Sequence, residues 1–176
     1  RALTALKTSE KKVNLLHGVT SSGKTEVYIH LIKKHIDFGK QVLFMVPEIA
    51  LTTQLVSRLK HAFGDKVGVY HSRFGMHERA ELWRDVKNNI RFPIVIGARS
   101  SVFLPFQDLG LIIVDEEHEN SFKQQDPAPR YQARDVAVYM GHHFDCQVVL
   151  GTATPSLETA YNVNKGKYGL CSLKQR

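Results

Sequence analysis

A short segment near the start of the chain has the residues needed to hold a polyphosphate. Residues 18–25 read Gly-Val-Thr-Ser-Ser-Gly-Lys-Thr, the phosphate-loop pattern of two glycines separated by four residues and followed by Lys and Thr. Its glycines let backbone N–H groups face the phosphates, and the following helix adds the positive end of its dipole. We expect Lys24 to reach the β- and γ-phosphates and the Thr25 hydroxyl to bind Mg²⁺. The residues expected to contact nucleotide here are Gly18, Val19, Thr20, Ser21, Ser22, Gly23, Lys24 and Thr25.

The alternative is an ordinary Gly/Ser-rich turn before a helix. The apolar run at residues 13–16 predicts a buried strand that enters the segment. Residues 26–38 carry apolar side chains at helical spacing, and Gly39 supplies a helix stop. A strand, a loop and a helix in this order favour the phosphate loop.

A second polar motif, Asp115-Glu116-Glu117-His118, follows residues 109–114, the most apolar stretch of the chain. Hydrolysis of a triphosphate needs a carboxylate that holds the metal and a group that orients water. Asp115, at the end of the strand, is expected to hold Mg²⁺, and Glu116 to polarise the attacking water. A solvated turn is the alternative, but burying two adjacent carboxylates without a cation is costly. The expected catalytic residues are Lys24, Asp115 and Glu116.

Strand-like and helix-like segments alternate along the chain. Further strand patterns cover residues 41–46, 66–70, 94–96 and 146–150, and further helical patterns cover residues 50–63, 76–88, 132–143 and a last helix ending near 164. Continuously apolar strands separated by helices predict an α/β fold, with a mainly parallel sheet covered by helices on both faces. Because ligands bind beyond the carboxyl ends of such strands, the polar motifs should gather at one edge. Residues 1–12 are interpreted as a short helix or arm outside this domain.

Composition sets broad limits on the function. The chain has 176 residues and 43% hydrophobic content, enough for one core. Its 24 Lys and Arg against 17 Asp and Glu leave a net charge of +7, which suits nucleic acid but equally describes many soluble basic proteins. Cys146 and Cys171 form neither a zinc nor a disulfide pattern. No apolar run approaches the roughly 20 residues that span a bilayer, so no membrane partner is expected. The chain opens at Arg1 without an initiator Met and is interpreted as a fragment.

Taken in order, these motifs resemble those of superfamily 2 helicases. Residues 18–25, 115–118 and 151–156 (Gly-Thr-Ala-Thr-Pro-Ser) look like motifs I, II and III, and residues 47–54 (Pro-Glu-Ile-Ala-Leu-Thr-Thr-Gln) look like motif Ia. The flanks are closer to the replication-restart helicases of that superfamily; they are residues 18–28, 94–106, 121–125 and 129–135.

The resemblance implies a RecA-like phosphate-loop NTPase domain over residues 13–176, as the first lobe of a helicase whose second lobe is absent. Two residues depart from the family pattern. Ser21 stands where the loop usually has Gly, and Thr152 where motif III usually has Ser. Ser21 must therefore adopt whatever backbone angle Gly normally supplies.

The resemblance also implies a path for single-stranded DNA, where small hydroxyls near helix starts hold phosphates without reading bases. The DNA-binding residues it implies are Thr52, Thr53, Gln54, Arg99, Ser100, Ser101, Phe122, Lys123, Arg130 and Tyr131. Residues 121–134, with Arg134 as a further cation, resemble an aromatic-rich loop that stacks on bases. The alternatives are ordinary helix caps for the hydroxyls and surface packing for the aromatics. His118 is expected to contact the nucleotide and, with Thr152 and Thr154, to couple it to the DNA path.

The function implied by the resemblance is that of an ATP-dependent 3′-to-5′ DNA helicase that acts on stalled or collapsed replication forks. The implied cofactors are ATP and Mg²⁺, with zinc only in the missing part of the protein. Implied partners are single-stranded and forked DNA, primosome proteins and single-strand-binding proteins, in the bacterial cytoplasm. The isolated lobe is expected to be inactive or slow. Alternatives are another superfamily 2 translocase, a nucleotide-gated DNA-binding module without turnover, and a small phosphotransferase.

Overall fold

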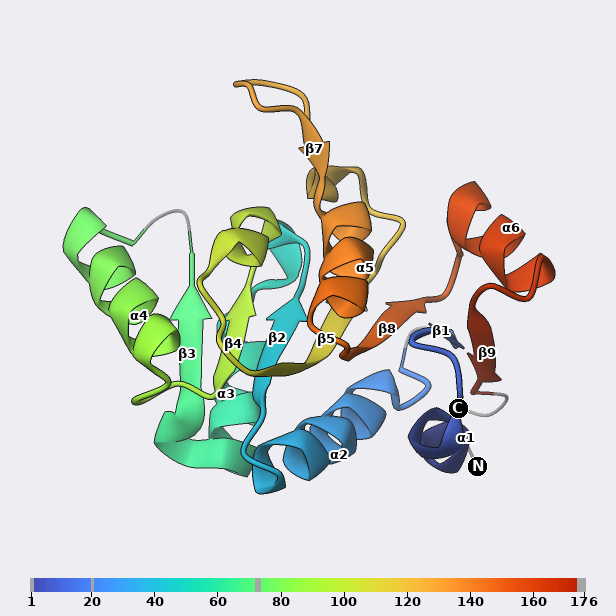
Figure 1. The fold of residues 1–176 in the computed structure, drawn as a ribbon, viewed down its shortest axis with the longest axis horizontal. Helices are drawn as coiled ribbons and strands as arrows, with labels where there is room; N and C mark the ends of the chain where they lie inside the picture. The colour runs from blue at the N-terminus through green and yellow to red at the C-terminus, as the bar shows by residue number, and fades with distance from the viewer. Residues whose placement is uncertain (1, 20, 72–73, 174–176) are drawn as a thin grey trace.

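A parallel β-sheet forms the centre of the molecule. The computed structural model describes residues 2–19, 21–71 and 74–173. Within them, seven strands form one sheet in the order β3-β4-β2-β5-β8-β1-β9, and a two-stranded hairpin, β6–β7, stands apart (Figure 1). The strands are β1 (Val13–His17), β2 (Gln41–Met45), β3 (Val67–Tyr70), β4 (Ile94–Gly97), β5 (Leu109–Asp115), β6 (Lys123–Gln124), β7 (Tyr131–Gln132), β8 (Gln147–Thr152) and β9 (Gly169–Ser172).

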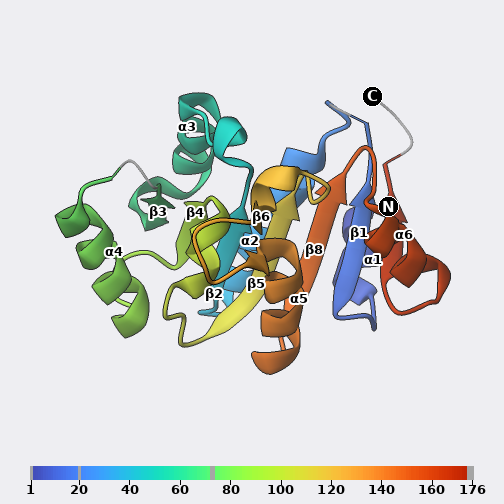
Figure 2. The ribbon, with the colours of Figure 1, turned by 90° about the horizontal axis from the view of Figure 1, so that it is seen from above.

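Helices cover both faces of the sheet, which confirms the predicted α/β class with a RecA-like arrangement. One face packs on α1, α2 and α3 through Leu6, Leu31 and Leu59. The other packs on α4 and α5 through Val86 and Ala137. Figure 2 shows α3 and α5 on opposite sides. The helices are α1 (Ala2–Thr8), α2 (Lys24–Asp37), α3 (Thr53–Phe63), α4 (Met76–Asn88), α5 (Ala133–His143) and α6 (Leu157–Asn164), with short 3₁₀ turns η1 (Glu48–Ala50), η2 (Gly64–Lys66), η3 (Arg99–Phe103) and η4 (Asn120–Phe122).

Apolar side chains on both faces explain why the strands read as continuous hydrophobic runs. Strand β2 is buried along its whole length, and β5 is buried from Leu111 to Val114. Alternation would be expected only if one face met water. None of the described helices is both long and apolar enough to span a bilayer.

The strand order brings the polar motifs together. Strand β8 lies between β5 and β1, with Asp115 opposite Gly151 and His17 opposite Thr152. Since all these strands are parallel, their carboxyl ends meet at one edge, where the loop after β1 also begins. Three segments far apart in sequence therefore share one corner of the molecule.

Two features were not predicted from the sequence. Strand β9 pairs in parallel with β1 although its sequence, Gly-Leu-Cys-Ser, buries only Cys171. The hairpin pairs Lys123 with Gln132 and projects from the carboxyl edge (Figure 1). Strands β6 and β7, with two residues each, are too short to display a period, and β9 contains only two apolar side chains, those of Leu170 and Cys171.

Candidate nucleotide and DNA site

The loop between β1 and α2 contains two described residues with positive φ. Ser21 and Gly23 both lie in the left-handed region, with φ of 63° and 89°. Ser21 thus takes an angle that normally favours glycine. A Cβ on Gly18 would lie 2.6 Å from the Ser22 hydroxyl and 3.0 Å from Leu173, so the chain is closely packed there. Thr20 lies outside the described residues.

The start of α2 has two features of the kind that bind an anion. Its N-cap is Gly23, and none of the described side chains caps it. The nearby Ser22 hydroxyl is buried without a hydrogen-bond partner among the described residues. The first N–H groups of a helix attract phosphate when nothing else satisfies them. Both observations fit the binding of the expected polyphosphate. Of the other loop residues expected to contact nucleotide, Val19 is exposed and Thr25 is half-buried.

Lys24 links the loop to the acidic motif. Its side chain is only 7% exposed, and its ammonium donates to the Gly18 carbonyl at 2.8 Å. The same nitrogen lies 3.6 Å from Oε1 of Glu116. Glu116 itself has a left-handed φ of 50°. The structure thus brings the lysine of one motif to the carboxylate of the other, across three strands of the sheet.

Asp115 is held by a residue that sequence reasoning missed. The Tyr28 hydroxyl, on α2, donates to Oδ1 of Asp115 at 2.8 Å. Burial raises the pKa of Asp115; the Tyr28 hydrogen bond and Lys24 oppose this, while the Glu116 charge adds to it. Burial, followed by the Asp115 charge, raises the pKa of Tyr28 well above its usual value, so the phenol remains a donor. A bound divalent cation would favour the ionised carboxylate.

Gly151 makes room for this pair. A Cβ at Gly151 would overlap the Tyr28 hydroxyl and lie 3.0 Å from Oδ1 of Asp115. Only a residue without a side chain allows β8 to pass so close to the two groups. The sequence motif contains this glycine, but the need for glycine at position 151 follows from the register of β8 against β5.

The three residues predicted to couple the sites do meet. Nδ1 of His118 lies 2.7 Å from Oγ1 of Thr152, which also accepts from the Thr154 N–H at 3.0 Å. Nδ1 of His118 lies 3.8 Å from Oε2 of Glu116. The geometry links motif II to motif III, while the side chain of Thr154 is exposed.

The predicted DNA residues near α3 and η3 are only partly available. Thr53, Gln54 and Ser100 are exposed. Thr52 is the N-cap of α3, and its hydroxyl accepts from the Leu55 N–H at 3.3 Å, so it serves as the helix cap given as the alternative. Ser101 is buried and donates to the Ala98 carbonyl at 2.6 Å. A buried hydroxyl cannot reach a phosphate, which argues against Ser101.

Arg99 is half-buried and contacts the protein. Its guanidinium donates to the backbone carbonyl groups of Ser121 at 3.4 Å and Lys123 at 3.1 Å. It therefore ties η3 to the start of the hairpin. A pocket of about 170 Å³ lies beside it, lined by residues from three segments, 46–48, 98–100 and 121–122.

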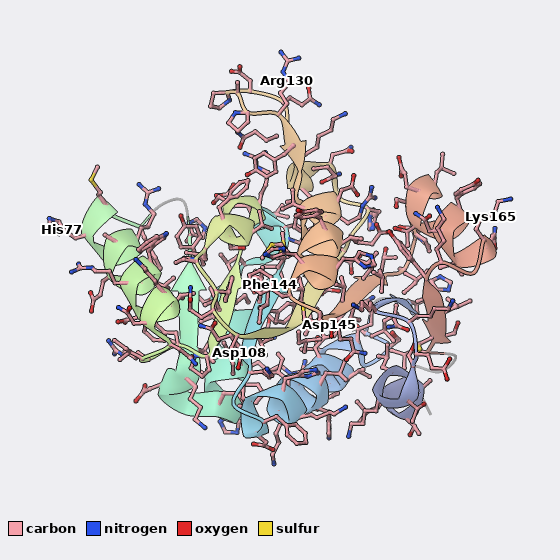
Figure 3. The ribbon with its side chains drawn as sticks, in the orientation of Figure 1. His77, Asp108, Arg130, Phe144, Asp145 and Lys165 are labelled. Atoms are coloured by element: carbon pink, nitrogen blue, oxygen red, sulfur yellow. The ribbon has the colours of Figure 1, made fainter. Side chains whose placement is uncertain are left out.

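The residues of the hairpin segment that were predicted to bind DNA differ in how exposed they are. Arg130 stands at the tip, far from the sheet (Figure 3), and Lys123 is exposed. The Tyr131 ring packs edge-on against Phe103, with centroids 4.9 Å apart. Phe122 is 0% exposed and belongs to the core, so it cannot stack on a base, contrary to expectation.

Arg134 was expected among the cations of this segment and is instead only 6% exposed. Its guanidinium pairs with Glu117 at 3.2 Å. Composition alone could not distinguish these buried positions from exposed ones.

The comparisons with known proteins agree with this arrangement. Residues 1–163 match the profile of the DEAD/DEAH box helicase family. The chain belongs to this family. The match covers both the phosphate loop and the acidic motif.

Curated relatives within the DEAD/DEAH box helicases are closer still. The chain is 49% identical over 172 residues to the replication restart protein PriA of Bacillus subtilis, covering 97% of this chain and 21% of that protein. It is 46% identical over 176 residues to the PriA protein of Rickettsia felis, covering 100% of this chain and 27% of that protein. The resemblance to replication-restart helicases is confirmed. The chain spans about a fifth to a quarter of the length of these relatives.

Solved structures of other helicases share the fold. RecG bound to a three-way DNA junction has a TM-score of 0.67 at 22% identity, covering 99% of this chain and 22% of RecG. The DUF1998 helicase MrfA bound to DNA and AMPPNP has a TM-score of 0.68 at 17% identity, covering 96% of this chain and 26% of MrfA. At these identities the likeness concerns the fold of a DEAD/DEAH box helicase domain.

Proposed function

We propose that this chain is the ATP-binding first lobe of a DNA helicase that acts in replication restart. The observation that carries the proposal is the meeting of two motifs from separate strands, with Nζ of Lys24 3.6 Å from Oε1 of Glu116 and Asp115 next to it. Residues 13–176 form the lobe, residues 1–12 precede it with a short helix that packs on the sheet through Leu6, and a second lobe is contributed by sequence outside this chain.

The proposed chemistry is ATP hydrolysis. The loop amides, the Ser22 hydroxyl and Lys24 bind the triphosphate, and Glu116 orients the attacking water. Thr25 and Asp115 would hold Mg²⁺, which supplies charge stabilisation to the transferred phosphoryl group when bound. Tyr28 keeps one oxygen of Asp115 occupied and thereby sets the direction of the other.

The proposed substrate is single-stranded or forked DNA. Support comes from the family, from relatives named replication restart proteins and from exposed groups at the carboxyl edge, including Ser100, Lys123 and Arg130. We extend this to 3′-to-5′ movement on stalled or collapsed forks, with primosome and single-strand-binding proteins as partners in the bacterial cytoplasm. Zinc, if the protein uses it, belongs to regions outside this chain.

The test measures DNA-stimulated ATP turnover and unwinding by the intact protein. Lys24→Ala and Glu116→Gln should each abolish stimulated turnover, because removing one group that stabilises developing charge typically costs about 10²–10³ in rate. Lys40→Ala is the matched control, since Lys40 is exposed and pairs with Asp108 at the amino ends of the strands. Partial duplexes with 3′ or 5′ overhangs test direction. Full turnover by Lys24→Ala would refute the proposal.

A nucleotide-gated binding module without turnover is the second candidate for the isolated chain. Within the described residues, the cation paired with Glu116 is Lys24. An arginine finger from a second lobe adds about 10³–10⁵ in rate in other nucleotide hydrolases. We therefore expect the isolated chain to bind nucleotide and to hydrolyse it slowly, and turnover equal to that of the intact protein would contradict this.

A further inference from the structure

Glu117 lies at the centre of a buried polar cluster beside the nucleotide site. Its side chain is 0% exposed. Oε1 accepts from the Ser156 N–H at 2.8 Å. Oε2 accepts from the Arg134 guanidinium at 3.2 Å, from the Ser156 hydroxyl at 2.9 Å and from the Thr159 hydroxyl at 3.0 Å. A buried carboxylate with this many donors is held in one place, because any movement leaves a donor unpaired.

The donors come from elements that are far apart in sequence. Arg134 is in the first turn of α5, Ser156 is the N-cap of α6, and Thr159 is inside α6. The backbone N–H of Glu117 also donates to the carbonyl of Gly151 in β8 at 3.1 Å. One residue thus joins the ends of β5 and β8 to both helices.

On one side, this cluster borders the residues proposed to act on ATP. Glu117 follows Glu116, whose backbone is in the left-handed region, and precedes His118, which contacts Thr152. Because these residues are consecutive, a shift of Glu117 changes the direction of the Glu116 carboxylate. That carboxylate lies 3.6 Å from the Lys24 ammonium.

On the other side, the cluster borders the hairpin. Strand β7 ends at Gln132, and α5 begins at the next residue, so Arg134 follows the hairpin almost directly. Figure 3 shows Arg130, near the hairpin tip, standing away from the sheet. Arg134 lies two residues after β7, whereas Glu117 lies six residues before β6, so Arg134 is the charged group of the cluster nearer to the hairpin along the chain.

Stability alone is a poor reason for such a pair. Apolar side chains of similar volume often stabilise a fold as well as a buried ion pair does. An ion pair differs in that its geometry is directional, particularly when a planar guanidinium is one partner. Its value is therefore in fixing relative positions.

We propose that Arg134 and Glu117 are positioning residues that connect the β6–β7 hairpin to the Glu116 carboxylate, so that single-stranded DNA on the hairpin sets the rate of ATP hydrolysis. The proposal deepens the proposed function and rests on it. Neither residue touches DNA or nucleotide; each acts through a neighbour.

The experiment measures ATP turnover by the intact protein with and without oligothymidylate. Glu117→Gln keeps the shape of the side chain but not its charge, and Arg134→Lys keeps the charge but not the planar fork. We expect the ratio of stimulated to basal turnover to fall about tenfold in each, a size typical of residues that link two sites. The KM for ATP should stay close to that of the unaltered protein. Glu158→Gln is the matched control, because Glu158 is 70% exposed and lies 3.8 Å from the same guanidinium.

The double variant separates a link from two independent effects. If the pair acts as one unit, Glu117→Gln combined with Arg134→Lys should lose little more stimulation than either single variant. Additive losses would overturn the proposal, as would unchanged ratios. Equal falls in basal and stimulated turnover would also overturn it by indicating a purely structural role.

Folding and the proposed function are checked separately. Thermal unfolding of each variant comes first, and if Glu117→Gln does not fold, an unchanged ratio in the milder Arg134→Lys still overturns the proposal. Absence of DNA-stimulated turnover in the unaltered protein would refute the proposed function itself and this inference with it. Stimulated turnover that persists in both variants would refute the inference alone.

Discussion

The starts of α2 and α3 differ in how their first N–H groups are satisfied. Both helices follow a parallel strand and begin near the carboxyl edge of the sheet. Helix α3 has Thr52 as its N-cap, whose hydroxyl accepts from the Leu55 N–H. Helix α2 has Gly23 as its N-cap, and among the described residues it has no side-chain cap and the adjacent buried Ser22 hydroxyl has no hydrogen-bond partner. The start of α3 is therefore capped by a side chain of the protein, whereas we propose that a bound anion takes this place at the start of α2.

The same contrast extends to the surrounding residues. On the nucleotide side, Lys24, Asp115 and Thr152 are buried or half-buried and connected to one another through Glu116 and His118. On the predicted DNA side, residues such as Thr53 and Gln54 are exposed. A phosphate loop requires a prearranged pocket, whereas a nonspecific grip on a DNA backbone needs only accessible donors.

Gly151→Ala should have the largest effect, because it disrupts the nucleotide side from within. The new Cβ would overlap the Tyr28 hydroxyl and crowd Asp115. Overpacking of this kind costs about 1–3 kcal/mol of stability, and ATP turnover should require a higher Mg²⁺ concentration. Urea unfolding and Mg²⁺ titration of turnover provide the two measurements. In a Tyr28→Phe background, Gly151→Ala should lower the free energy of unfolding by less. An equal decrease would show that overlap with the Tyr28 hydroxyl is not the cause.

Thr52→Ala tests the capped helix. Loss of an N-cap typically costs about 1 kcal/mol, which lowers Tm by about 2–4 °C in a protein of this size. Affinity for single-stranded DNA should remain unchanged, because the Thr52 hydroxyl already accepts a hydrogen bond from the Leu55 N–H. Thr53→Ala is the matched control: it should weaken DNA binding and leave Tm almost unchanged. Tm is measured by calorimetry and DNA affinity by fluorescence anisotropy. Weaker DNA binding by Thr52→Ala together with a lower Tm for Thr53→Ala would contradict the contrast between the two helices.

Ser22→Ala tests the uncapped helix. Removing a buried hydroxyl that has no partner should leave Tm of the nucleotide-free protein unchanged or slightly higher. Nucleotide affinity should fall about 2–10-fold, because one hydrogen bond to phosphate is lost. Calorimetric titration with a non-hydrolysable ATP analogue provides the measurement. A lower Tm with unchanged nucleotide affinity would mean that the Ser22 hydroxyl stabilises the fold and does not bind phosphate.

Arg130→Ala should have the smallest effect. The side chain stands near the hairpin tip, and its loss should change no contact of the core (Figure 3). One fewer phosphate contact reduces the slope of log affinity against log salt by about 0.7 for single strands. Lys165→Ala, an exposed cation on the Tyr161 ring, is the control. An unchanged slope for Arg130→Ala would exclude the tip from the DNA path.

The nucleotide side was largely predictable from the sequence. The spacing of Gly18, Gly23 and Lys24 is dictated by the shape of a polyphosphate, and a parallel sheet collects the carboxyl ends of its strands. Local pattern and topology together therefore predicted that Lys24 and Asp115 would meet. Tyr28 and Gly151 were missed because their contact depends on strand register, which has no local signature.

The DNA side was less predictable because exposure in irregular segments has no period. Phe122 and Tyr131 occupy the same cation-rich stretch, yet one is in the core and the other is half-buried against Phe103. Arg134 and Arg130 differ in the same way. Residue type says what chemistry a group could do, and only packing decides whether it can be reached.

The position of β9 has a consequence for how the protein is made. Strand β1 is synthesised well before its two neighbours, β8 and β9, and Leu15 lies opposite both Leu150 and Leu170. Contacts this distant in sequence form late. During synthesis the phosphate loop is therefore attached to a strand that has both edges open until β8 and β9 have been made, and a chain cut before β9 would leave one edge of β1 available for aggregation.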